Sequence, residues 1–133
     1  MPGETDLRTL LKTMRPVLHE EPYVLCSVDQ DAYDKLAFEP LGKFLEQEGI
    51  TVIATQQQAR DNGLSFDAIW AYITLTVHSS LSAVGFLAAL TGRLAQAGIS
   101  VNVVSAYYHD HLFVPWESRW KVMDILEELS RSQ

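Results

Sequence analysis

A histidine–aspartate–histidine sequence in the second half of the chain carries the side chains best suited to chemistry. His109, Asp110 and His111 lie within the stretch AYYHDHLFVP, residues 106–115. Two imidazoles beside a carboxylate could bind a metal ion, move protons or hydrogen-bond a ligand. The same residues are also typical of a polar turn between two strands. Zinc sites use three or four protein ligands, and this half of the chain has only one other histidine, His78.

The overall composition excludes several classes of function. The chain has 133 residues, 47% hydrophobic and 20% charged, which suits one compact domain or two small packed halves. A net charge of −7 argues against a nucleic-acid partner, because phosphate binding needs a basic surface. The N-terminus lacks a secretory signal and no apolar run reaches the ~20 residues that span a bilayer, so we expect a cytoplasmic protein without a membrane partner. The single cysteine, Cys26, is expected to be a buried hydrophobic residue.

The first half of the chain predicts two helices and two strands. The predicted elements are a helix over residues 7–18, strands over 23–28 and 50–54, and a helix over 56–62. Thr5 or Asp6 could cap the first helix, and Pro16 is expected to end or kink it. Residues 38–45 fit either a turn with a short strand or a poor helix. His19 is expected at the surface.

The second half gives clearer patterns. The predicted elements are a strand over residues 72–77, a helix over 82–97, a strand over 99–107, a hairpin loop over 108–111, a strand over 112–114 and a helix over 116–129. Ser79 or Ser80 could cap the first of these helices, and Gly98 would end it. Trp116 and Trp120 are expected to pack the last helix on the sheet.

Both halves therefore follow the same order, β-α-β-β-α. This order indicates a weak internal repeat of roughly 50 residues, with the first copy degenerate. Such units, laid side by side, give an α+β fold of the ferredoxin-like kind, with antiparallel sheets and the helices on one face. We expect an N-terminal helix over residues 1–20, a degenerate unit over 21–66 and a second unit over 67–133.

Three motifs in the second half resemble a known family. ITLTVHSS, AGIS-N-V and YYHDH-FVP occur in that order between residues 73 and 115. This run resembles the ACT domain, most closely small bacterial tandem ACT-like proteins, and is similar to the arginine-sensing ACT proteins of animal cells. The resemblance implies an ACT fold, regulation rather than catalysis, and an amino acid or similar small ligand bound where domains pair. It also implies a homodimer and an unknown protein partner, because the chain has no room for an attached enzyme.

We expect the ligand where the long helix begins and the hairpin turns. The amides of about Leu81 to Gly85, at the positive end of the helix, suit a carboxylate, and Gly85 permits close approach. Asp110 at the hairpin tip suits an ammonium or guanidinium group. The expected ligand-binding residues are His78, Ser79, Ser80, Leu81, Val84, Gly85, Asn102, His109, Asp110 and His111.

Each of these residues also has a purely structural interpretation. The serines could only cap the helix, Asp110 could only close a turn, and Asn102 could bond a neighbouring loop. Two other functions are open. One is an enzyme or metalloprotein that uses His78, His109, Asp110 and His111. The other is a dimerisation module without a ligand. No nucleophile–base series, phosphate loop or zinc-protease pattern is visible, so we expect no catalytic residues and no cofactor.

Overall fold

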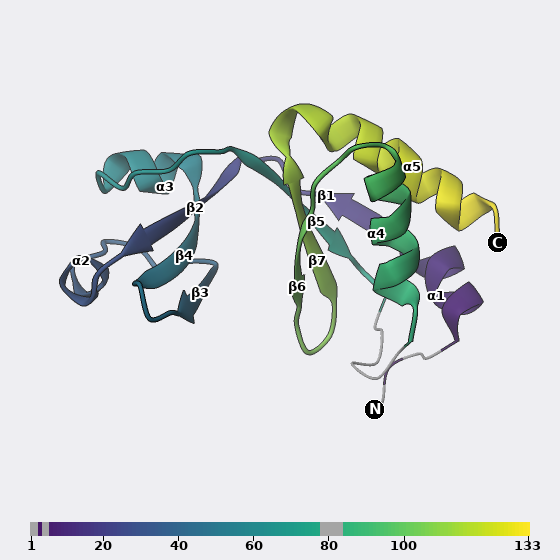
Figure 1. The fold of residues 1–133 in the computed structure, drawn as a ribbon, viewed down its shortest axis with the longest axis horizontal. Coiled ribbons are helices and arrows are strands. Elements are labelled where there is room, and N and C mark those ends of the chain that lie inside the picture. Colours follow the sequence, from purple (N-terminus) through teal and green to yellow (C-terminus); the bar gives the residue numbers. More distant parts are fainter. Residues whose placement is uncertain (1–2, 4–5, 78–83) are drawn as a thin grey trace. The chain divides into compact units, whose positions relative to one another are not determined.

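The computed structural model describes residue 3, residues 6–77 and residues 84–133. The chain divides into two compact units, each described by itself below. Unit 1 comprises residues 1–20 and 71–133, and unit 2 comprises residues 21–70. Figure 1 labels the helices and strands of both. Among the described residues, no helix combines the length and the apolar character needed to cross a bilayer.

Unit 2 is a three-stranded antiparallel sheet with two short helices. Its elements are β2 (Tyr23–Val28), α2 (Gln30–Asp34), β3 (Gly42–Leu45), β4 (Ile50–Thr55) and α3 (Gln56–Asp61). The strand order is β3-β4-β2, with Cys26 opposite Val52. The strands predicted over residues 23–28 and 50–54 are confirmed, and the ambiguous residues 38–45 contain the short strand β3.

Period-two alternation builds the core of unit 2, since every second side chain of a strand points to the same face. Val24 and Cys26 of β2 pack with Val52 of β4 and Ala59 of α3. Cys26 is therefore the buried hydrophobic residue that the sequence predicts, and burial raises the pKa of its thiol.

Helix α3 begins with a capping box, in which the Thr55 side chain accepts from the Gln58 amide and the Gln58 side chain accepts from the Thr55 amide. Helix α2 was not expected. Its signal is Asp29, whose carboxylate accepts from the Ala32 amide at 2.8 Å.

Unit 1 contains the remaining elements around a sheet of order β1-β5-β7-β6. They are α1 (Leu7–Thr13), β1 (Pro16–Leu18), β5 (Trp70–Leu75, whose first residue belongs to unit 2), α4 (Phe86–Gln96), β6 (Asn102–Ser105), β7 (Asp110–Pro115), η1 (Trp116–Ser118) and α5 (Arg119–Arg131). The order β5-α4-β6-β7-α5 repeats that of unit 2, as the sequence predicts.

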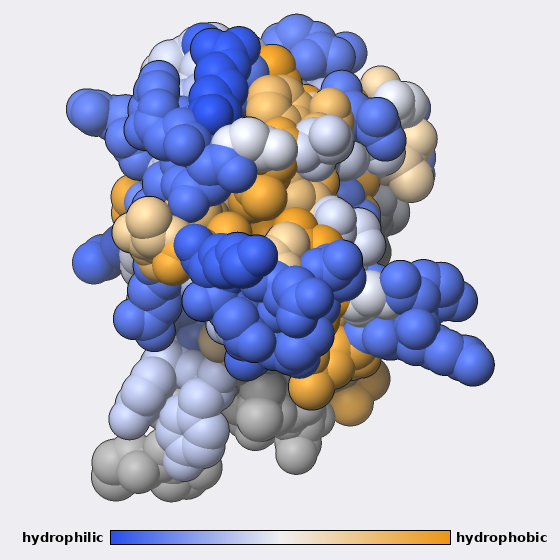
Figure 2. Space-filling model, turned by 90° about the vertical axis from the view of Figure 1, so that its left-hand side faces the viewer, coloured by the Kyte–Doolittle hydropathy of each residue, from blue (hydrophilic) through white to orange (hydrophobic). Residues whose placement is uncertain are grey.

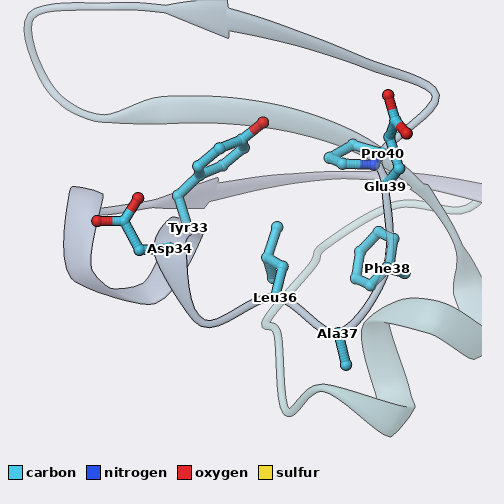
Figure 3. Close-up of a pocket in the computed structure, with 7 residues that line it drawn as sticks. All are labelled: Tyr33, Asp34, Leu36, Ala37, Phe38, Glu39 and Pro40. Atoms are coloured by element: carbon cyan, nitrogen blue, oxygen red, sulfur yellow. The ribbon is translucent and has the colours of Figure 1, made fainter.

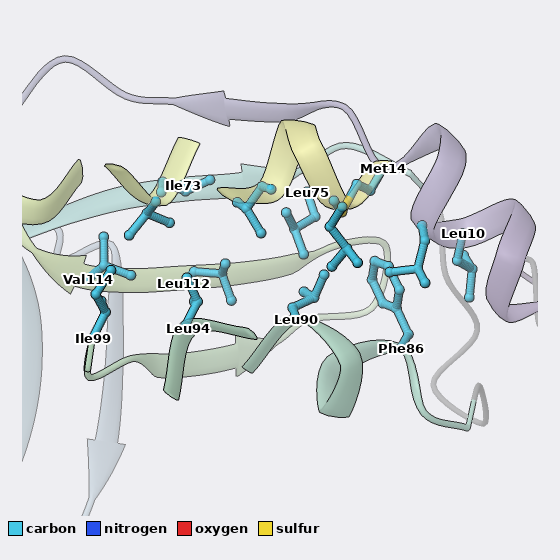
Figure 4. Close-up of a cluster of buried hydrophobic side chains, with 14 of the residues drawn as sticks. Leu10, Met14, Ile73, Leu75, Phe86, Leu90, Leu94, Ile99, Leu112 and Val114 are labelled. Atoms are coloured by element: carbon cyan, nitrogen blue, oxygen red, sulfur yellow. The ribbon is translucent and has the colours of Figure 1, made fainter. Parts of the chain in front are cut away.

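In the described part of unit 1, helices α1, α4 and α5 share one hydrophobic core on one face of the sheet. Side chains from α1 and α4 meet those of β5 and β7 (Figure 4). Fully buried members include Leu10, Leu90, Leu126, Ile73 and Leu112. The helices therefore cover a single face of the sheet, and the ferredoxin-like α+β prediction is confirmed.

The first helix is shorter than its apolar spacing predicts. It ends at Thr13, and Pro16 begins β1, because proline lacks the amide that continues a helix. Leu18 belongs to this strand and not to the helix. Arg15 makes the bend with a positive φ of 42°. Asp6 caps the helix through the Thr9 amide, as expected.

The long helix starts later than predicted. Gly85 occupies the N-cap position of α4 with a φ of 85°, in the left-handed region. A right-handed helix does not continue through such a residue, so α4 does not begin at Ser82 as predicted. Ser79 and Ser80, the predicted caps, lie outside the described residues. Gly98 follows the other end of the helix with a φ of 74°, as predicted.

The last helix differs in the face that it buries. Residues 116–118 form the 3₁₀ turn η1, and α5 then buries Val122, Leu126 and Leu129. Trp120 does not pack on the sheet, since it is off this stripe and 65% exposed. Trp116 is half-buried against the core, and the Arg119 guanidinium lies 3.8 Å from the centre of its ring.

Helix α5 should therefore tolerate loss of its large aromatic side chain better than loss of a leucine. We expect Leu126→Ala to lower the free energy of unfolding by about 2–5 kcal/mol, because it opens a cavity. Trp120→Ala should change it by less than about 1 kcal/mol, because the ring is mostly in solvent. Urea denaturation measures both. An equal loss in the two variants would place Trp120 in the core after all.

Candidate ligand-binding site

The β6–β7 hairpin turns two residues earlier than the sequence predicts, because β6 ends at Ser105 and β7 begins at Asp110. Ser105 pairs with Asp110, and the Ala106 amide donates to the His109 carbonyl at 3.0 Å. The turn is therefore made by Tyr107 and Tyr108, which are both exposed. The sequence analysis expected Asp110 at the hairpin tip, and this is wrong. Asp110 is the first residue of β7 and is only 6% exposed.

Asp110 lies on the helix-covered face of the sheet. Alternation along β7 places it on the same face as Leu112 and Val114, which belong to the core that α4 covers. Figure 1 shows the hairpin turn and the beginning of α4 at the same end of unit 1. A carboxylate at this end of the sheet is favoured by the positive end of the α4 dipole.

His109 ties the hairpin to the end of β5. Its Nδ1 lies 3.1 Å from the Val77 carbonyl oxygen. Val77 is the residue immediately before His78, and the connection to α4 follows. The structure therefore brings the hairpin turn and the beginning of this connection together.

Several predicted site residues lie outside the described part of the chain, namely His78, Ser79, Ser80 and Leu81. After them, Val84 is exposed and Gly85 is the N-cap of α4. The amides without a partner inside the helix are those of its first turn, beginning at Phe86. Of the expected amides of residues 81–85, those of residues 81–83 lie outside the described residues and stay a prediction, while Gly85 immediately precedes the helix.

Asn102 is not at this end of the hairpin. It pairs with Phe113, whereas Asp110 pairs with Ser105, three residues farther along β6. That spacing corresponds to about 10 Å along a strand. Asn102 is also exposed, so the need to satisfy a buried amide does not arise.

The face of the sheet that the helices leave uncovered carries a polar network that the sequence analysis missed. Thr74, only 8% exposed, has its hydroxyl 2.8 Å from His19 Nε2 and 3.0 Å from His111 Nδ1. The Tyr72 hydroxyl lies 3.2 Å from the same His111 nitrogen. The His19 ring stacks on Tyr72 with centroids 4.0 Å apart. The sequence analysis expected His19 at the surface, whereas the structure shows it half-buried.

Strand β1 positions His19 in this network. Val17 pairs with Thr74, and the His19 amide donates to the Tyr72 carbonyl at 2.9 Å. The available signal in the sequence was the alternation of Tyr72 and Thr74 with the core residues of β5. It indicates a second face, but the short strand that brings His19 there gives no clear pattern of its own.

Burial favours the neutral form of both imidazoles of the network. Burial lowers the pKa of His19. Burial, and secondarily the neighbouring His109, lowers the pKa of His111, while the Asp110 carboxylate acts weakly in the opposite direction. A neutral imidazole has one nitrogen that donates and one that accepts. The single Thr74 hydroxyl can therefore donate to one ring and accept from the other.

The histidine–aspartate–histidine sequence does not converge on a metal. Asp110 and His111 are successive residues of β7 and point to opposite faces of the sheet, while His109, just before the strand, contacts the Val77 carbonyl. Within residues 6–77 and 84–133, no three histidine, cysteine, aspartate or glutamate side chains are placed to hold a metal ion. The fourth residue of the metal alternative, His78, is outside these ranges.

The histidine network predicts a loss of stability on mild acidification. Both folded-state pKa values lie below the ordinary value of about 6.5, so the unfolded chain takes up protons first as the pH falls. Stability from the network is full above about pH 6.5 and is lost as the pH falls towards the lowered values. Urea denaturation at about pH 7.5 and pH 5.5 should show this loss, and His111→Gln should reduce it.

Thr74→Val serves as a companion variant, because it keeps both imidazoles but removes their shared hydroxyl. It should lower the free energy of unfolding at pH 7.5 by about 1–2 kcal/mol. A His111→Gln variant with the same pH dependence as the wild type would show that this ring does not titrate as described.

Comparison with known proteins matches both halves of the chain to one family. Profiles of the ACT domain match residues 2–71 and again residues 68–128. ACT domains are ligand-binding regulatory modules, and many of them bind amino acids. A comparison with curated proteins gives no match.

Solved structures give the same fold over nearly the whole chain. A Vibrio cholerae protein of unknown function, described as a possible transport protein, is 42% identical with a TM-score of 0.83, over 93% of this chain and 95% of that one. An Agrobacterium tumefaciens protein is 16% identical with a TM-score of 0.72, over 86% and 87%. The ligand-free regulatory subunit of aspartate kinase from Thermus thermophilus is 10% identical with a TM-score of 0.69, over 89% and 98%. The chain belongs to the ACT-domain family and carries two such domains in tandem.

Proposed function

We propose that this protein is a regulatory module that binds a small molecule, an amino acid. The site lies in unit 1, where α4 begins and the β6–β7 hairpin turns. The contact between His109 Nδ1 and the Val77 carbonyl, at 3.1 Å, carries this proposal. It holds the hairpin beside the connection that leads into α4, so groups from both can reach one ligand.

The chemistry of this end of unit 1 suits a zwitterion. First-turn amides of α4, beginning at Phe86, would bind the ligand carboxylate, and the absence of a Cβ at Gly85 lets it approach the backbone. The Asp110 carboxylate and the His109 ring would complement the ligand ammonium group. His111 would fix the orientation of β7, since its Nδ1 contacts Tyr72 and Thr74.

The remaining parts of the site are proposed from sequence. Val84 would border the ligand, and His78, Ser79, Ser80 and Leu81 would complete the site between β5 and α4. Ligand binding would shift the population of conformations that a homodimer or another protein partner recognises. The regulatory subunit of aspartate kinase, which has the same fold, supports regulation as the role.

Thermal denaturation with each of the common amino acids at millimolar concentration tests this function. A ligand that binds only the folded state must raise the melting temperature. At a free ligand concentration of 100 times Kd it adds about 2.7 kcal/mol to the free energy of unfolding. We expect one amino acid, or a few related ones, to raise it by several degrees. A constant melting temperature with a constitutive dimer would instead indicate a dimerisation module without a ligand.

Two variants locate the binding. His109→Ala should reduce the ligand-induced rise in melting temperature, because the hairpin loses its link to Val77. Asn102→Ala is the matched control, since this exposed polar residue lies at the other end of the same hairpin. An equal reduction in both variants would contradict the position of the site.

A further inference from the structure

A second candidate site lies within unit 2 and shares no residue with the first. A hollow of about 660 Å³ opens between the end of α2 and the segment before β3. A smaller one of about 230 Å³ adjoins it, and Tyr33, Glu39 and Pro40 line both. The larger volume falls within the roughly 300–1,000 Å³ typical of small-molecule sites.

The walls of the larger hollow are held by backbone hydrogen bonds. The Leu36 amide donates to the Tyr33 carbonyl at 3.1 Å, and the Leu41 amide donates to the Ile53 carbonyl at 2.9 Å. Between them, the Ala37 amide donates to Asn62 Oδ1 at 3.1 Å. Tyr33 and Leu36 also pack against the core of unit 2. A ligand would therefore meet a wall that is ordered before binding, which lowers the entropy lost on association.

The charged side chains here are complementary to a zwitterion. Figure 3 shows Glu39 and Pro40 on the side of the hollow opposite Tyr33, and Asp34 turned away from Tyr33. Asp34 accepts from Gln30 Nε2 at 2.8 Å, whereas Glu39 makes no ion pair or hydrogen bond with any described residue. A carboxylate that is not engaged elsewhere can bind an ammonium group.

The positively charged side chain of Lys43 lines the smaller hollow. Lys43 lines it together with Glu39, and its ammonium lies 4.5 Å from the centre of the Tyr33 ring. The cation–π contact directs this lysine towards the shared wall. Glu39 and Lys43 thus place opposite charges beside Tyr33 and Pro40. A ligand that is only a cation would need the carboxylate but not the lysine.

The rest of the lining is apolar. Leu36 and Phe38 are half-buried in the larger hollow, and Leu41, 48% exposed, lines the smaller one. Figure 2, which faces the left-hand side of Figure 1, shows hydrophobic surface exposed among hydrophilic side chains. Contact with an apolar ligand side chain would remove part of the lining surface from water.

We propose that this pair of hollows binds an α-amino acid with an apolar side chain. Glu39 binds its ammonium group, Lys43 its carboxylate, and Leu36 with Phe38 its side chain. The inference does not depend on the site proposed in unit 1, because every residue involved belongs to unit 2.

The test is a titration of the ¹⁵N-labelled full chain with L-leucine, followed by backbone amide NMR. We expect saturable shifts at the amides of residues 36–39 and 41, since Pro40 has no amide proton. 3-Methylbutylamine, which lacks the carboxylate, and 4-methylpentanoate, which lacks the ammonium group, should each bind about tenfold more weakly, since each loses one charge-assisted contact. Equal affinity for the amine would overturn the zwitterion assignment, and so would the absence of saturable shifts at millimolar L-leucine.

Matched variants separate this site from the one in unit 1. Glu39→Gln and Lys43→Met should each raise the Kd for L-leucine about tenfold at residues 36–39 and 41. Glu48→Gln, an exposed acid of unit 2, and Lys121→Met in α5 should leave it unchanged. His109→Ala should also leave these shifts unchanged, whether or not unit 1 binds a ligand. Shifts confined to unit 1, or a Glu39→Gln variant that binds normally, would overturn the proposal.

Discussion

The burial of β5 on both faces is the constraint on which unit 1 depends. Ile73 and Leu75 point into the core under the helices, while Tyr72 and Thr74 point to the other face, and all four are buried. A shift of register by one residue would exchange the two sets and place a hydroxyl in the aliphatic core. The same register sets where the strand ends, and so which carbonyl, that of Val77, is presented to the hairpin.

Local signals in the sequence predicted the elements whose stabilisation is itself local. YVLCSV and ITVIA are bounded by turn residues and alternate in burial, so their strands were found almost residue for residue. The Asp6 cap and the glycine after α4 were also predicted, because each depends only on residues within one turn. The β-α-β-β-α order followed from these elements, and with it the ferredoxin-like fold.

The rest depended on pairing between distant segments or on one backbone angle. His19 is half-buried because β1 pairs with β5, more than fifty residues away in sequence, and a three-residue strand is too short to show periodicity. Asp110 is buried because the hairpin turns at Tyr107 and Tyr108, and a shift of one residue in a turn decides whether a side chain is in the loop or in the sheet. The predicted helix over residues 82–97 includes Gly85, but the positive φ of this residue makes it the N-cap of α4. The sequence therefore predicts that the hairpin turn and the connection into α4 lie at one end of unit 1, which the His109–Val77 contact supports, but it does not predict the orientation of Asp110.

The Thr74 hydroxyl connects the two histidines in a way that their spacing in sequence does not reveal. It has one proton, so it can donate to one imidazole and accept from the other, and the reverse arrangement satisfies the same atoms. Either arrangement requires the ring that accepts the hydroxyl proton to be neutral, whereas the ring that donates its N–H can be neutral or protonated. Protonation of both would direct two N–H donors at one oxygen and leave the hydroxyl proton without an acceptor among them, which is costly where water is partly excluded. His111, on β7, thus connects the uncovered face of the sheet with the hairpin, because His109, two residues before it and just ahead of β7, contacts Val77.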